Sequence, residues 1–393
     1  MTRNFIFPIR TLTVLLIAST LLFSPACRKE SLPTPDEENV TTAAHSTPVQ
    51  PSRILITQNT AFGVFSCQVL DLGGTVLQWK YFPSSVIDFK RWDINGTIRY
   101  TCELTNPSGY FIPTVTGHSP CEAVIMDEDF NEINRVRLLP YNGRSPSDPD
   151  DLDNHDFILI DDNHYITMTY YEMVVNNIPS SLNPVPNCKV VAPIIQEVEN
   201  GNVLWEWNGT DFPELYISSQ EGNRFSDTAQ VDDYAHINSI YIDPNDNNLL
   251  CSFRNLDQII KIERLTGQIL WKLGGTDSDF PLTASQKFLR QHHATLTDNN
   301  ETLLLFDNGN DARTYSRVVE FKLDEISKTV QSFKALNLPV AYYGKFQGSV
   351  QKFDDYYFVC NGLGRKMLKT KTDSPVIQFS KTLPYVSYRA FMY

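Results

Sequence analysis

Several features that would place a chain in a common functional class are absent from this sequence. It has no run of basic residues, and 46 acidic side chains against 33 Lys and Arg give a net charge of −13. This balance argues against a nucleic-acid partner, because phosphate binding needs clustered Lys and Arg. Helical periodicity is nearly absent from about residue 60 onward. The chain is therefore predicted to be an all-β protein.

Cysteine is scarce, and its spacing is not that of a metal site. None of the seven Cys residues lies in a Cys-x-x-Cys motif, so we expect no zinc. The acidic segment 148–156 lacks the glycine and terminal Glu of an EF-hand loop, so no calcium is expected there. Cys102 and Cys121 are the closest pair. Either they form a disulfide, which an exported chain permits, or they are buried free thiols.

No hydrophobic run is long enough to be a convincing membrane span. A shorter apolar stretch, residues 11–23, follows Arg3 and Arg10, which predicts a secretory signal peptide. The segment ending at Cys27 resembles a bacterial lipobox. We therefore expect residues 1–26 to be removed and Cys27 to be lipidated. The protein would then be a cell-envelope lipoprotein whose only membrane contact is this lipid.

The residues after Cys27 divide into a tether and a folded domain. Residues 27–55 are rich in Pro, Thr, Ser and Glu without a periodic pattern, which is typical of a flexible tether. Residues 56–393 are predicted to fold as one domain, since large all-β folds often reach this length.

Short β-patterned runs with a recurring motif fill the folded domain. Segments 70–79, 199–207 and 264–273 each combine a glycine turn with an apolar strand that contains Trp near its end. Such a unit is typical of the outer hairpin of a propeller blade, where the Trp packs between blades.

The repeat itself is clearest in the second half of the chain. Stretches 236–275 and 292–336 align at a shift of 56 residues (292 − 236), and each contains four predicted strands. Four antiparallel strands in 40–50 residues are typical of a β-propeller. Weaker copies are found at 60–100, 109–140, 155–209 and 348–393, with inserts at 172–187 and 210–232. The sequence therefore predicts six blades, closed with help from residues 388–393.

Basic side chains recur where these blades begin. His155, His236 and His292 each open a strand–turn–strand segment. Arg254 mirrors His236 about residue 245, so antiparallel pairing would bring the two side by side. Asn238 would face the same side as His236, two residues away. If the first strands surround one axis, these groups converge into a site suited to sulfate or phosphate.

The motifs around these residues resemble those of the bacterial arylsulfate sulfotransferase family. The resemblance spans roughly residues 150–325 and rests on several motifs. In the first part of this range they are Asn154-His155-Asp156, His236-Ile237-Asn238-Ser239 with Ser252-Phe253-Arg254, and the stretch from Arg264 to Gly275. In the last part they are Gln291-His292-His293-Ala294, Leu305-Phe306-Asp307-Asn308-Gly309 and Ser316-Arg317-Val318-Val319-Glu320.

The resemblance implies a six-bladed propeller and a ping-pong transfer that needs no cofactor and no nucleotide sulfate donor. His292 would attack the sulfur of a phenolic sulfate ester and form a sulfohistidine, from which a second phenol takes the sulfuryl group. Arg254 would bind the sulfuryl oxygens, together with Asn238 and His155. Either His236 or His155 would serve as proton donor and acceptor. The partners implied are small phenolic sulfates and phenols.

The sequence departs from the family pattern in two respects. His293 follows His292 directly, and strand alternation lets only one of them face the channel; the Gln-His match favours His292. The separate N-terminal β-domain through which some members dimerise has no counterpart in the expected tether, so dimerisation is not carried over.

Other classes of function remain open from the residues. A non-catalytic surface lipoprotein could use the same Arg and His side chains to bind sulfated or anionic glycans. A polysaccharide lyase or a quinone-dependent dehydrogenase could also share a propeller. His118 and His164 are interpreted as structural histidines.

Overall fold

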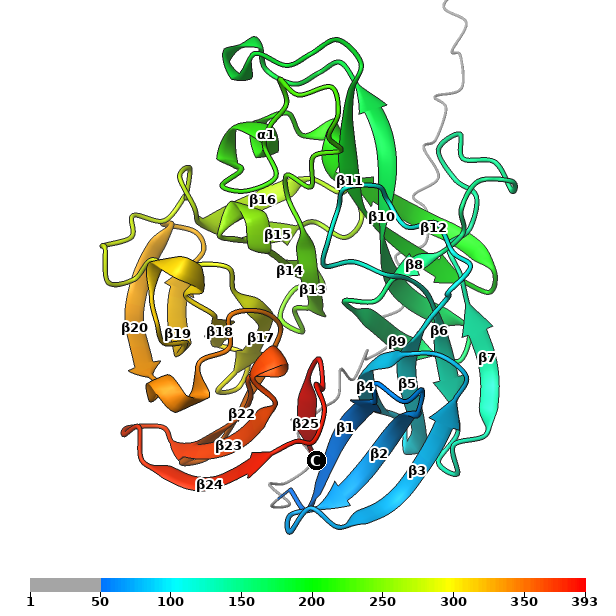
Figure 1. The fold of residues 1–393 in the computed structure, drawn as a ribbon. Coiled ribbons are helices and arrows are strands. Elements are labelled where there is room, and N and C mark those ends of the chain that lie inside the picture. The colour runs from blue at the N-terminus through cyan, green and yellow to red at the C-terminus, as the bar shows by residue number, and fades with distance from the viewer. Residues whose placement is uncertain (1–50) are drawn as a thin grey trace, which may run out of the picture. The chain divides into compact units, whose positions relative to one another are not determined.

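The computed structural model describes residues 51–393, and Figure 1 shows them as a ring of β-sheets. The expected signal peptide, the lipidation site Cys27 and most of the expected tether lie outside the described residues. The first strand of the described residues begins at Arg53. No helix within the described range is sufficiently long and apolar to cross a membrane.

Six antiparallel blades, each with a four-stranded core, make up the ring, which confirms the predicted fold class. Blade 1 consists of β25 (Ala390–Met392), β1 (Arg53–Asn59), β2 (Phe65–Asp71) and β3 (Val76–Phe82), and blade 2 of β4 (Val86–Ile94), β5 (Thr97–Thr105), β6 (Pro120–Met126) and β7 (Glu132–Val136), with β8 (Leu152–Asp153) beside β6. Blade 3 consists of β9 (Phe157–Asp161), β10 (His164–Val175), β11 (Cys188–Glu199) and β12 (Asn202–Asn208), and blade 4 of β13 (Ile237–Ile242), β14 (Leu249–Phe253), β15 (Gln258–Ile262) and β16 (Ile269–Gly274). Blade 5 consists of β17 (His292–Thr297), β18 (Thr302–Asp307), β19 (Arg317–Asp324) and β20 (Thr329–Asn337), and blade 6 of β21 (Ser349–Phe353), β22 (Tyr356–Cys360), β23 (Lys366–Lys371) and β24 (Ile377–Thr382).

Helical segments are confined to the connections. They are η1 (Ser180–Leu182), η2 (Gly209–Asp211), α1 (Glu214–Ser218), η3 (Arg254–Leu256), η4 (Asn310–Ala312), η5 (Val340–Tyr342) and η6 (Gly362–Gly364).

The C-terminal strand closes the ring. β25 pairs with β1 in the register Ile54↔Met392 to Ile56↔Ala390, so blade 1 takes one strand from the end of the chain. This confirms the predicted participation of residues 388–393. The pairing covers an edge of β1 that would otherwise expose its backbone N–H and C=O groups.

The limits of blades 3, 4 and 5 were predicted well, whereas those of blades 1 and 2 were predicted wrongly. The predicted strands of blades 4 and 5 match the observed ones within a few residues. Blade 1 instead ends at β3 and blade 2 spans 86–136, against the predicted 60–100 and 109–140. The long connection 106–119 lies inside blade 2, between β5 and β6, whereas only residues 83–85 separate the two blades. A turn-rich segment was thus mistaken for a blade boundary.

The two predicted inserts differ in character. β10 and β11 remain paired as far as Val175↔Cys188, so the irregular part of the first insert is only 176–187. The second insert, 210–232, contains η2 and α1, and in Figure 1 it lies beside the long β10–β11 hairpin. Leu215 and Tyr216 of α1 are buried, and the Tyr216 ring packs 4.4 Å from that of Tyr234. The second insert is therefore anchored to the blades.

Cysteine and tryptophan show how the blades are packed. All six cysteines of the described part are buried and free, so Cys102 and Cys121 are not bridged. Trp271 is buried and its ring lies 5.4 Å from that of Phe280, as expected of a Trp between blades. Trp79 does not follow this pattern: it lies on β3, the outer strand of blade 1, and is 53% exposed.

Candidate active site

Four predicted residues come together where the inner strands of blades 3, 4 and 5 begin. His155 lies between β8 and β9, His236 directly precedes β13, His292 opens β17 and Arg254 opens η3. All four are buried, with at most 6% of each residue exposed. The backbone N–H of Arg254 donates to the carbonyl of His236 at 2.8 Å, so the predicted pairing of these two residues is confirmed.

His155 and His236 form a contacting pair of rings. Their centroids are 5.0 Å apart and their planes are nearly perpendicular. Tyr170 lies against both rings, at 5.7 and 5.5 Å. Nδ1 of His155 is hydrogen-bonded to Asp153, and Nδ1 of His236 is 2.6 Å from Asp233 Oδ2. A carboxylate at Nδ1 places hydrogen there and leaves Nε2 as the atom that accepts or donates a proton.

The environment of His236 favours a neutral ring. Burial lowers its pKa, and this outweighs the opposing effect of Asp233; the charges of His155 and Arg254 lower the pKa further.

His292 is held in the tautomer that a nucleophile requires. Its Nδ1 lies 2.8 Å from Asn308 Oδ1 and 3.1 Å from the carbonyl of Arg290. The Asn308 amide is oriented by its Nδ2, which donates to the carbonyls of Gly344 and Gln347 at 2.7 and 2.8 Å. Both groups facing Nδ1 are therefore acceptors, so the hydrogen is on Nδ1 and the lone pair is on Nε2.

Electrostatics keep this lone pair available. Burial lowers the pKa of His292 well below the usual value, and the charge of Arg254 is the next cause, with smaller effects from His155 and His236. A ring with such a pKa is neutral near pH 7. Nε2 receives a long hydrogen bond, 3.3 Å, from the backbone N–H of Gln347.

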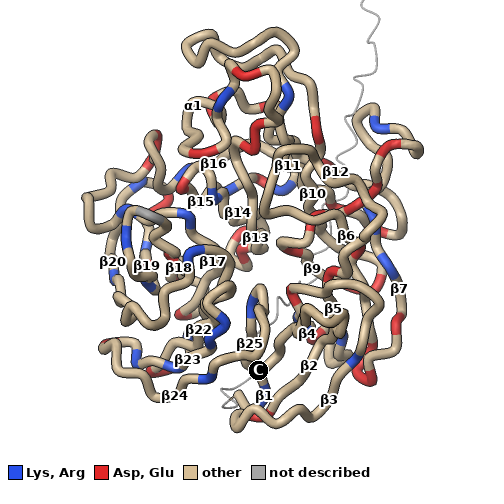
Figure 2. Tube along the Cα trace, in the orientation of Figure 1, with Lys and Arg blue, Asp and Glu red and all other residues tan. Residues whose placement is uncertain are grey.

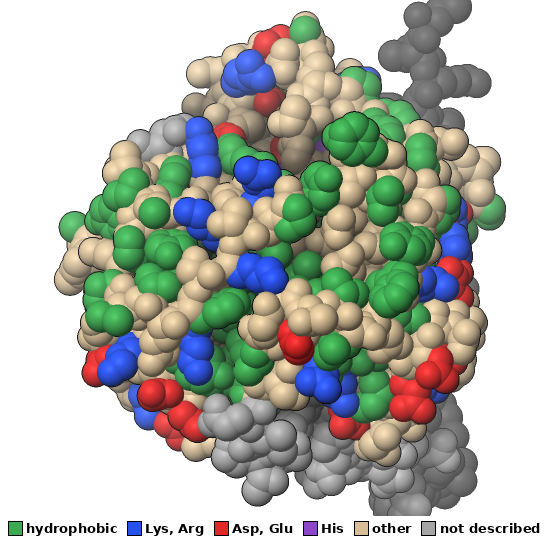
Figure 3. Space-filling model, turned by 60° about the horizontal axis from the view of Figure 1, so that its bottom comes forward, with side chains coloured by type: hydrophobic (Ala, Val, Ile, Leu, Met, Phe, Trp, Pro, Cys, Tyr) green, Lys and Arg blue, Asp and Glu red, His purple; other side chains and the backbone are tan. Residues whose placement is uncertain are grey.

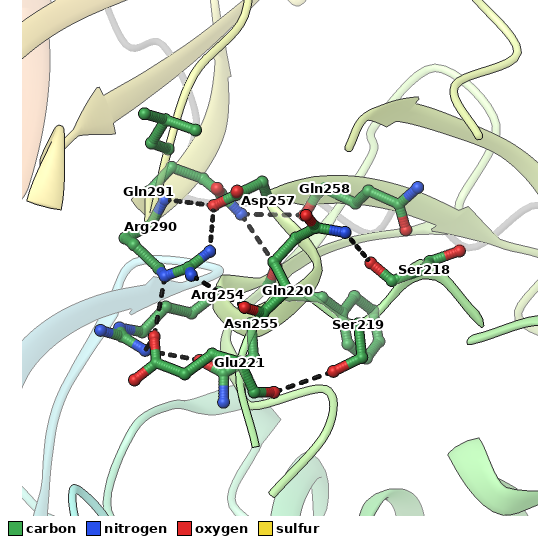
Figure 4. Close-up of polar contacts among 12 residues, drawn as sticks. Ser218, Ser219, Gln220, Glu221, Arg254, Asn255, Asp257, Gln258, Arg290 and Gln291 are labelled. Atoms are coloured by element: carbon green, nitrogen blue, oxygen red, sulfur yellow. Dashed lines mark hydrogen bonds and ion pairs between the residues drawn. The ribbon is translucent and has the colours of Figure 1, made fainter. Parts of the chain in front are cut away.

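Arg254 completes the cluster. Its Nη1 donates to Glu221 Oε2 at 3.0 Å and to the Asn255 side chain. The guanidinium carbon lies 5.4 Å from the centre of the Phe346 ring. Figure 4 shows Arg254 and Arg290 on either side of Glu221. A planar guanidinium fixed at one nitrogen still offers donors for a tetrahedral anion.

His293 is turned to different surroundings. Its Nδ1 accepts from the backbone N–H of Val350 at 3.3 Å, and its ring contacts Phe391 at 5.4 Å. Burial and then the charge of Arg389 lower its pKa to about 3. The bulge between His292 and Thr295 gives His293 a positive φ of 52°, yet the two rings still have separate partners. Of the two histidines, His292 is the one that is hydrogen-bonded to Asn308 and whose pKa is lowered by the charge of Arg254.

Asn238 ties blade 4 to the segment before His292. It is fully buried, and its Nδ2 donates to the carbonyl of Gln291 at 2.8 Å. Its Oδ1 is buried without a hydrogen-bond partner among the described residues. This is the one amide oxygen of the predicted site residues that remains to receive a donor.

A buried charge network lies behind this cluster. Arg389 contacts Asp88 at 3.0 Å and Asp156 at 3.3 Å, and Lys90 pairs with both carboxylates. Burial, and after it the charge of Asp88, raises the pKa of the nearby Glu103 well above the usual value. Figure 2 shows acidic residues near the labels of β4, β9 and β13, toward the centre of the ring.

A cleft of about 260 Å³ adjoins the histidine pair. Asp153 and Tyr170 belong both to its wall and to the surroundings of His155, and the remaining lining includes Tyr110, His118 and Glu172. His118, interpreted from the sequence as structural, lies with its ring 5.9 Å from that of Tyr170. In Figure 3 part of a histidine side chain is visible inside a hollow of the face drawn.

The other histidine interpreted as structural behaves as such. His164 Nε2 lies 2.7 Å from Glu197, which also binds Arg264. His164 opens β10, at the end of β9 opposite His155. Within residues 51–393 no group of three or more His, Cys, Asp or Glu is arranged to hold a metal ion.

Comparisons with known proteins give one family and several distant folds. The family model described as arylsulfotransferase matches residues 91–384. No curated protein matches the chain. Among solved structures, a protein of unknown function from Bacteroides caccae is 11% identical, with 86% of this chain and 98% of that chain covered and a TM-score of 0.42. The Swd1 β-propeller domain of Myceliophteria thermophila is 11% identical, with 88% and 90% covered and a TM-score of 0.42. A putative 6-phosphogluconolactonase of Bacteroides fragilis is 7% identical, with 89% and 100% covered and a TM-score of 0.40.

Proposed function

Because the chain belongs to the arylsulfotransferase family, whose model matches residues 91–384, we propose that it transfers a sulfuryl group from a phenolic sulfate ester to a phenol through a sulfohistidine at His292. The observation that carries this proposal is the state of His292: a buried neutral imidazole, hydrogen on Nδ1 and a lone pair on Nε2, beside a fixed arginine. An imidazole that binds an anion does so by donating an N–H, whereas Nε2 of His292 carries a lone pair that accepts only a long hydrogen bond from the backbone N–H of Gln347.

In the first half-reaction the Nε2 lone pair attacks the sulfur of the donor. The N–S bond forms while the bond between sulfur and the aryl oxygen breaks, and the electron pair leaves with the phenolate. One ring of the pair His155 and His236, carrying a second hydrogen on Nε2, gives that proton to the oxygen and is left neutral with its Nδ1–H donating to Asp153 or Asp233. The sulfated ring keeps its Nδ1 hydrogen, which Asn308 and the Arg290 carbonyl accept, so the positive charge on the ring is stabilised.

The second half-reaction reverses these steps with a new phenol. The histidine that gave up its proton now takes one from the acceptor hydroxyl, the phenol oxygen attacks sulfur, and the pair of the N–S bond returns to Nε2. His155 and His236 are both suited to this exchange, since each has its Nδ1 bound to a carboxylate. We therefore assign the proton transfer to the pair.

Arg254 balances the negative sulfuryl oxygens, and the adjoining cleft accommodates the aryl ring. The guanidinium stabilises charge on the oxygens in both half-reactions. Tyr110 and Tyr170 offer aromatic faces in the cleft of about 260 Å³. This supports phenolic donors and acceptors of modest size. Export as an envelope lipoprotein anchored at Cys27 remains part of the same proposal.

The proposal is tested by intact mass spectrometry of the full-length protein mixed with 4-nitrophenyl sulfate. We expect the mass of one added sulfuryl group on the peptide that holds residues 291–294, together with release of nitrophenol. His292→Ala should lose both signals, whereas His293→Ala should keep them.

An adduct that persists in His292→Ala would move the nucleophile elsewhere. No adduct and no nitrophenol across several aryl sulfates would instead identify the protein as a non-catalytic anion-binding propeller.

A further inference from the structure

One carboxylate is shared by two arginines at the edge of the site. Oε2 of Glu221 accepts from Arg254 Nη1 at 3.0 Å and from Arg290 Nε at 2.8 Å. The two guanidinium groups are mostly buried, with side chains 7% and 11% exposed, whereas the Glu221 side chain is 46% exposed. Figure 4 shows Glu221 between the two arginines.

The loop that carries Glu221 is fixed, so only its side chain has freedom to move. The backbone N–H of Gln220 donates to the carbonyl of Asn255 at 2.7 Å. Ser219 Oγ donates to the carbonyl of Tyr234 at 2.8 Å. These contacts hold the insert 210–232 against the segment that begins with Arg254. A half-exposed carboxylate on a fixed backbone can change partner without repacking buried groups.

Arg290 is positioned to bind the Glu221 carboxylate without help from Arg254. Its Nη1 donates to Asp257 Oδ1 at 2.8 Å and its backbone N–H donates to the same oxygen at 2.7 Å. Its side chain is thereby kept beside Glu221. Its carbonyl accepts from Nδ1 of His292 at 3.1 Å, which links this arginine to the nucleophile.

We propose that Glu221 is an exchangeable counter-ion of the sulfuryl site: its carboxylate is shared between Arg254 and Arg290, and the arrival of a sulfuryl group on Arg254 shifts it to Arg290. The inference deepens the proposed function and rests on Arg254 being the group that binds the sulfuryl oxygens.

The exchange has two consequences for binding. Glu221 competes with the anionic substrate for the charge of Arg254, so it lowers the affinity for any sulfate group. It also fixes one nitrogen of the guanidinium, Nη1, so that the remaining N–H groups keep one orientation. Removing only the charge of Glu221 should therefore change the affinity for sulfate. Removing its whole side chain should also change the orientation of the Arg254 guanidinium.

The experiment measures inorganic sulfate binding by isothermal titration calorimetry on full-length protein at constant ionic strength. Glu221→Gln removes the charge but keeps an acceptor oxygen. We expect it to tighten sulfate binding about two- to tenfold, the range that one partly screened charge contributes. The KM for 4-nitrophenyl sulfate should fall by a similar factor while kcat changes less than about twofold.

Glu221→Ala and an exposed neighbour serve as comparisons. Glu221→Ala removes the hold on Arg254 as well, so its kcat should fall although sulfate binds tightly. Glu214→Gln removes the same charge from an exposed position of α1 in the same insert and should change neither quantity.

A double-mutant cycle tests the role of Arg290. Arg290→Gln should weaken sulfate binding in the native background, because Glu221 then remains on Arg254. The same substitution should have a smaller effect in the Glu221→Gln background. Equal effects in both backgrounds, or a Glu221→Gln variant that behaves like Glu214→Gln, would overturn the proposal.

The outcome is separable from the proposed function. Sulfate binding does not require turnover, so the counter-ion inference stands if sulfate affinity responds as expected even when no sulfohistidine forms. Conversely, a sulfohistidine without any response of sulfate affinity to Glu221→Gln would leave the transferase proposal intact and refute this one.

Discussion

At the scale of single residues, the reactivity of His292 depends on the position of one hydrogen. Asn308 Oδ1 accepts the hydrogen bond from Nδ1 of His292. The Nδ2 of Asn308 is bonded to two backbone carbonyls, so the amide cannot turn a donor toward the ring without losing those bonds. Burial and Arg254 keep the pKa of His292 low, so the lone pair on Nε2 is not lost to protonation near neutral pH.

Replacing Asn308 tests this arrangement through pH. In Asn308→Asp a carboxylate would face Nδ1, and an opposite charge raises the pKa of a histidine. The acidic limb of kcat/KM for 4-nitrophenyl sulfate should therefore move to higher pH. Asn308→Ala should reduce kcat about a hundredfold through misplacement of the ring, with less change in KM. An acidic limb that stays in place in Asn308→Asp would contradict the assignment of Asn308 as the positioning residue.

The sequence identified the candidate reacting residues better than the residues that support them. His155, His236, His292 and Arg254 stood out by their spacing and motifs. Their partners Asp153 and Asp233 lie only two and three residues before their histidines, but His236 has a positive φ of 51°, and such a backbone turn is not visible in a pattern. The signals available in the sequence were an Asp two residues before His155 and an Asp three residues before His236.

Glu221 left no such signal. It lies 33 residues before Arg254, and the insert that carries it has no repeat pattern. Only tertiary packing brings the two together.

At the scale of the elements, regular repeats were predictable and irregular ones were not. Blades 4 and 5 have short turns, so alternation and turn residues locate each of their strands. The closing strand β25 of blade 1 was expected from the general rule that a propeller is closed by a strand from the opposite terminus, whereas blade 2 contains the connection 106–119, which follows no local pattern. The charge network of Arg389 was missed for the same reason, since its partners come from blades 2 and 3.

Gln291 shows how neighbouring blades are joined at the site. It is fully buried, and its Nε2 donates to Ser252 Oγ at 3.0 Å and to the carbonyls of Phe253 and Gln258 at 3.2 and 2.9 Å. One amide group, directly before the first strand of blade 5, thus contacts three acceptors of blade 4, next to the proposed nucleophile His292.

Replacing Gln291 should affect both stability and activity. In Gln291→Leu these buried groups lose the amide donor, while Ser252 Oγ keeps a bond to the main-chain carbonyl of residue 291. The free energy of unfolding should therefore fall by about 1–3 kcal/mol in urea titrations. Because His292 follows directly, kcat should fall as well. Lys287→Ala, at an exposed position of the same connection, is the control. A stable Gln291→Leu variant would show that the three bonds contribute little to joining the blades.

At the scale of the whole molecule, the ends of the folded chain are joined by backbone pairing and by buried charge. β25 pairs with β1, and the adjacent Arg389 contacts Asp88 of blade 2 and Asp156 of blade 3 with its side chain only 1% exposed. The negative charges of Asp88 and Asp156 are balanced there by the positive charges of Lys90 and Arg389. Burial raises the pKa of Asp88, and Arg389 is the largest influence that opposes this.

Removing Arg389 should therefore destabilise the closed ring in a pH-dependent way. In Arg389→Met, Asp88 and Asp156 keep only Lys90, and breaking a buried ion pair costs about 3–5 kcal/mol of unfolding free energy. The unpaired carboxylate is penalised only while it is charged, so the deficit against the native protein should shrink as pH falls and the carboxylate is protonated. Urea titrations between neutral and mildly acidic pH measure this, with the exposed Arg53→Met on β1 as the control. A deficit that is equal at all pH values would show that Arg389 closes the ring by packing and not by charge.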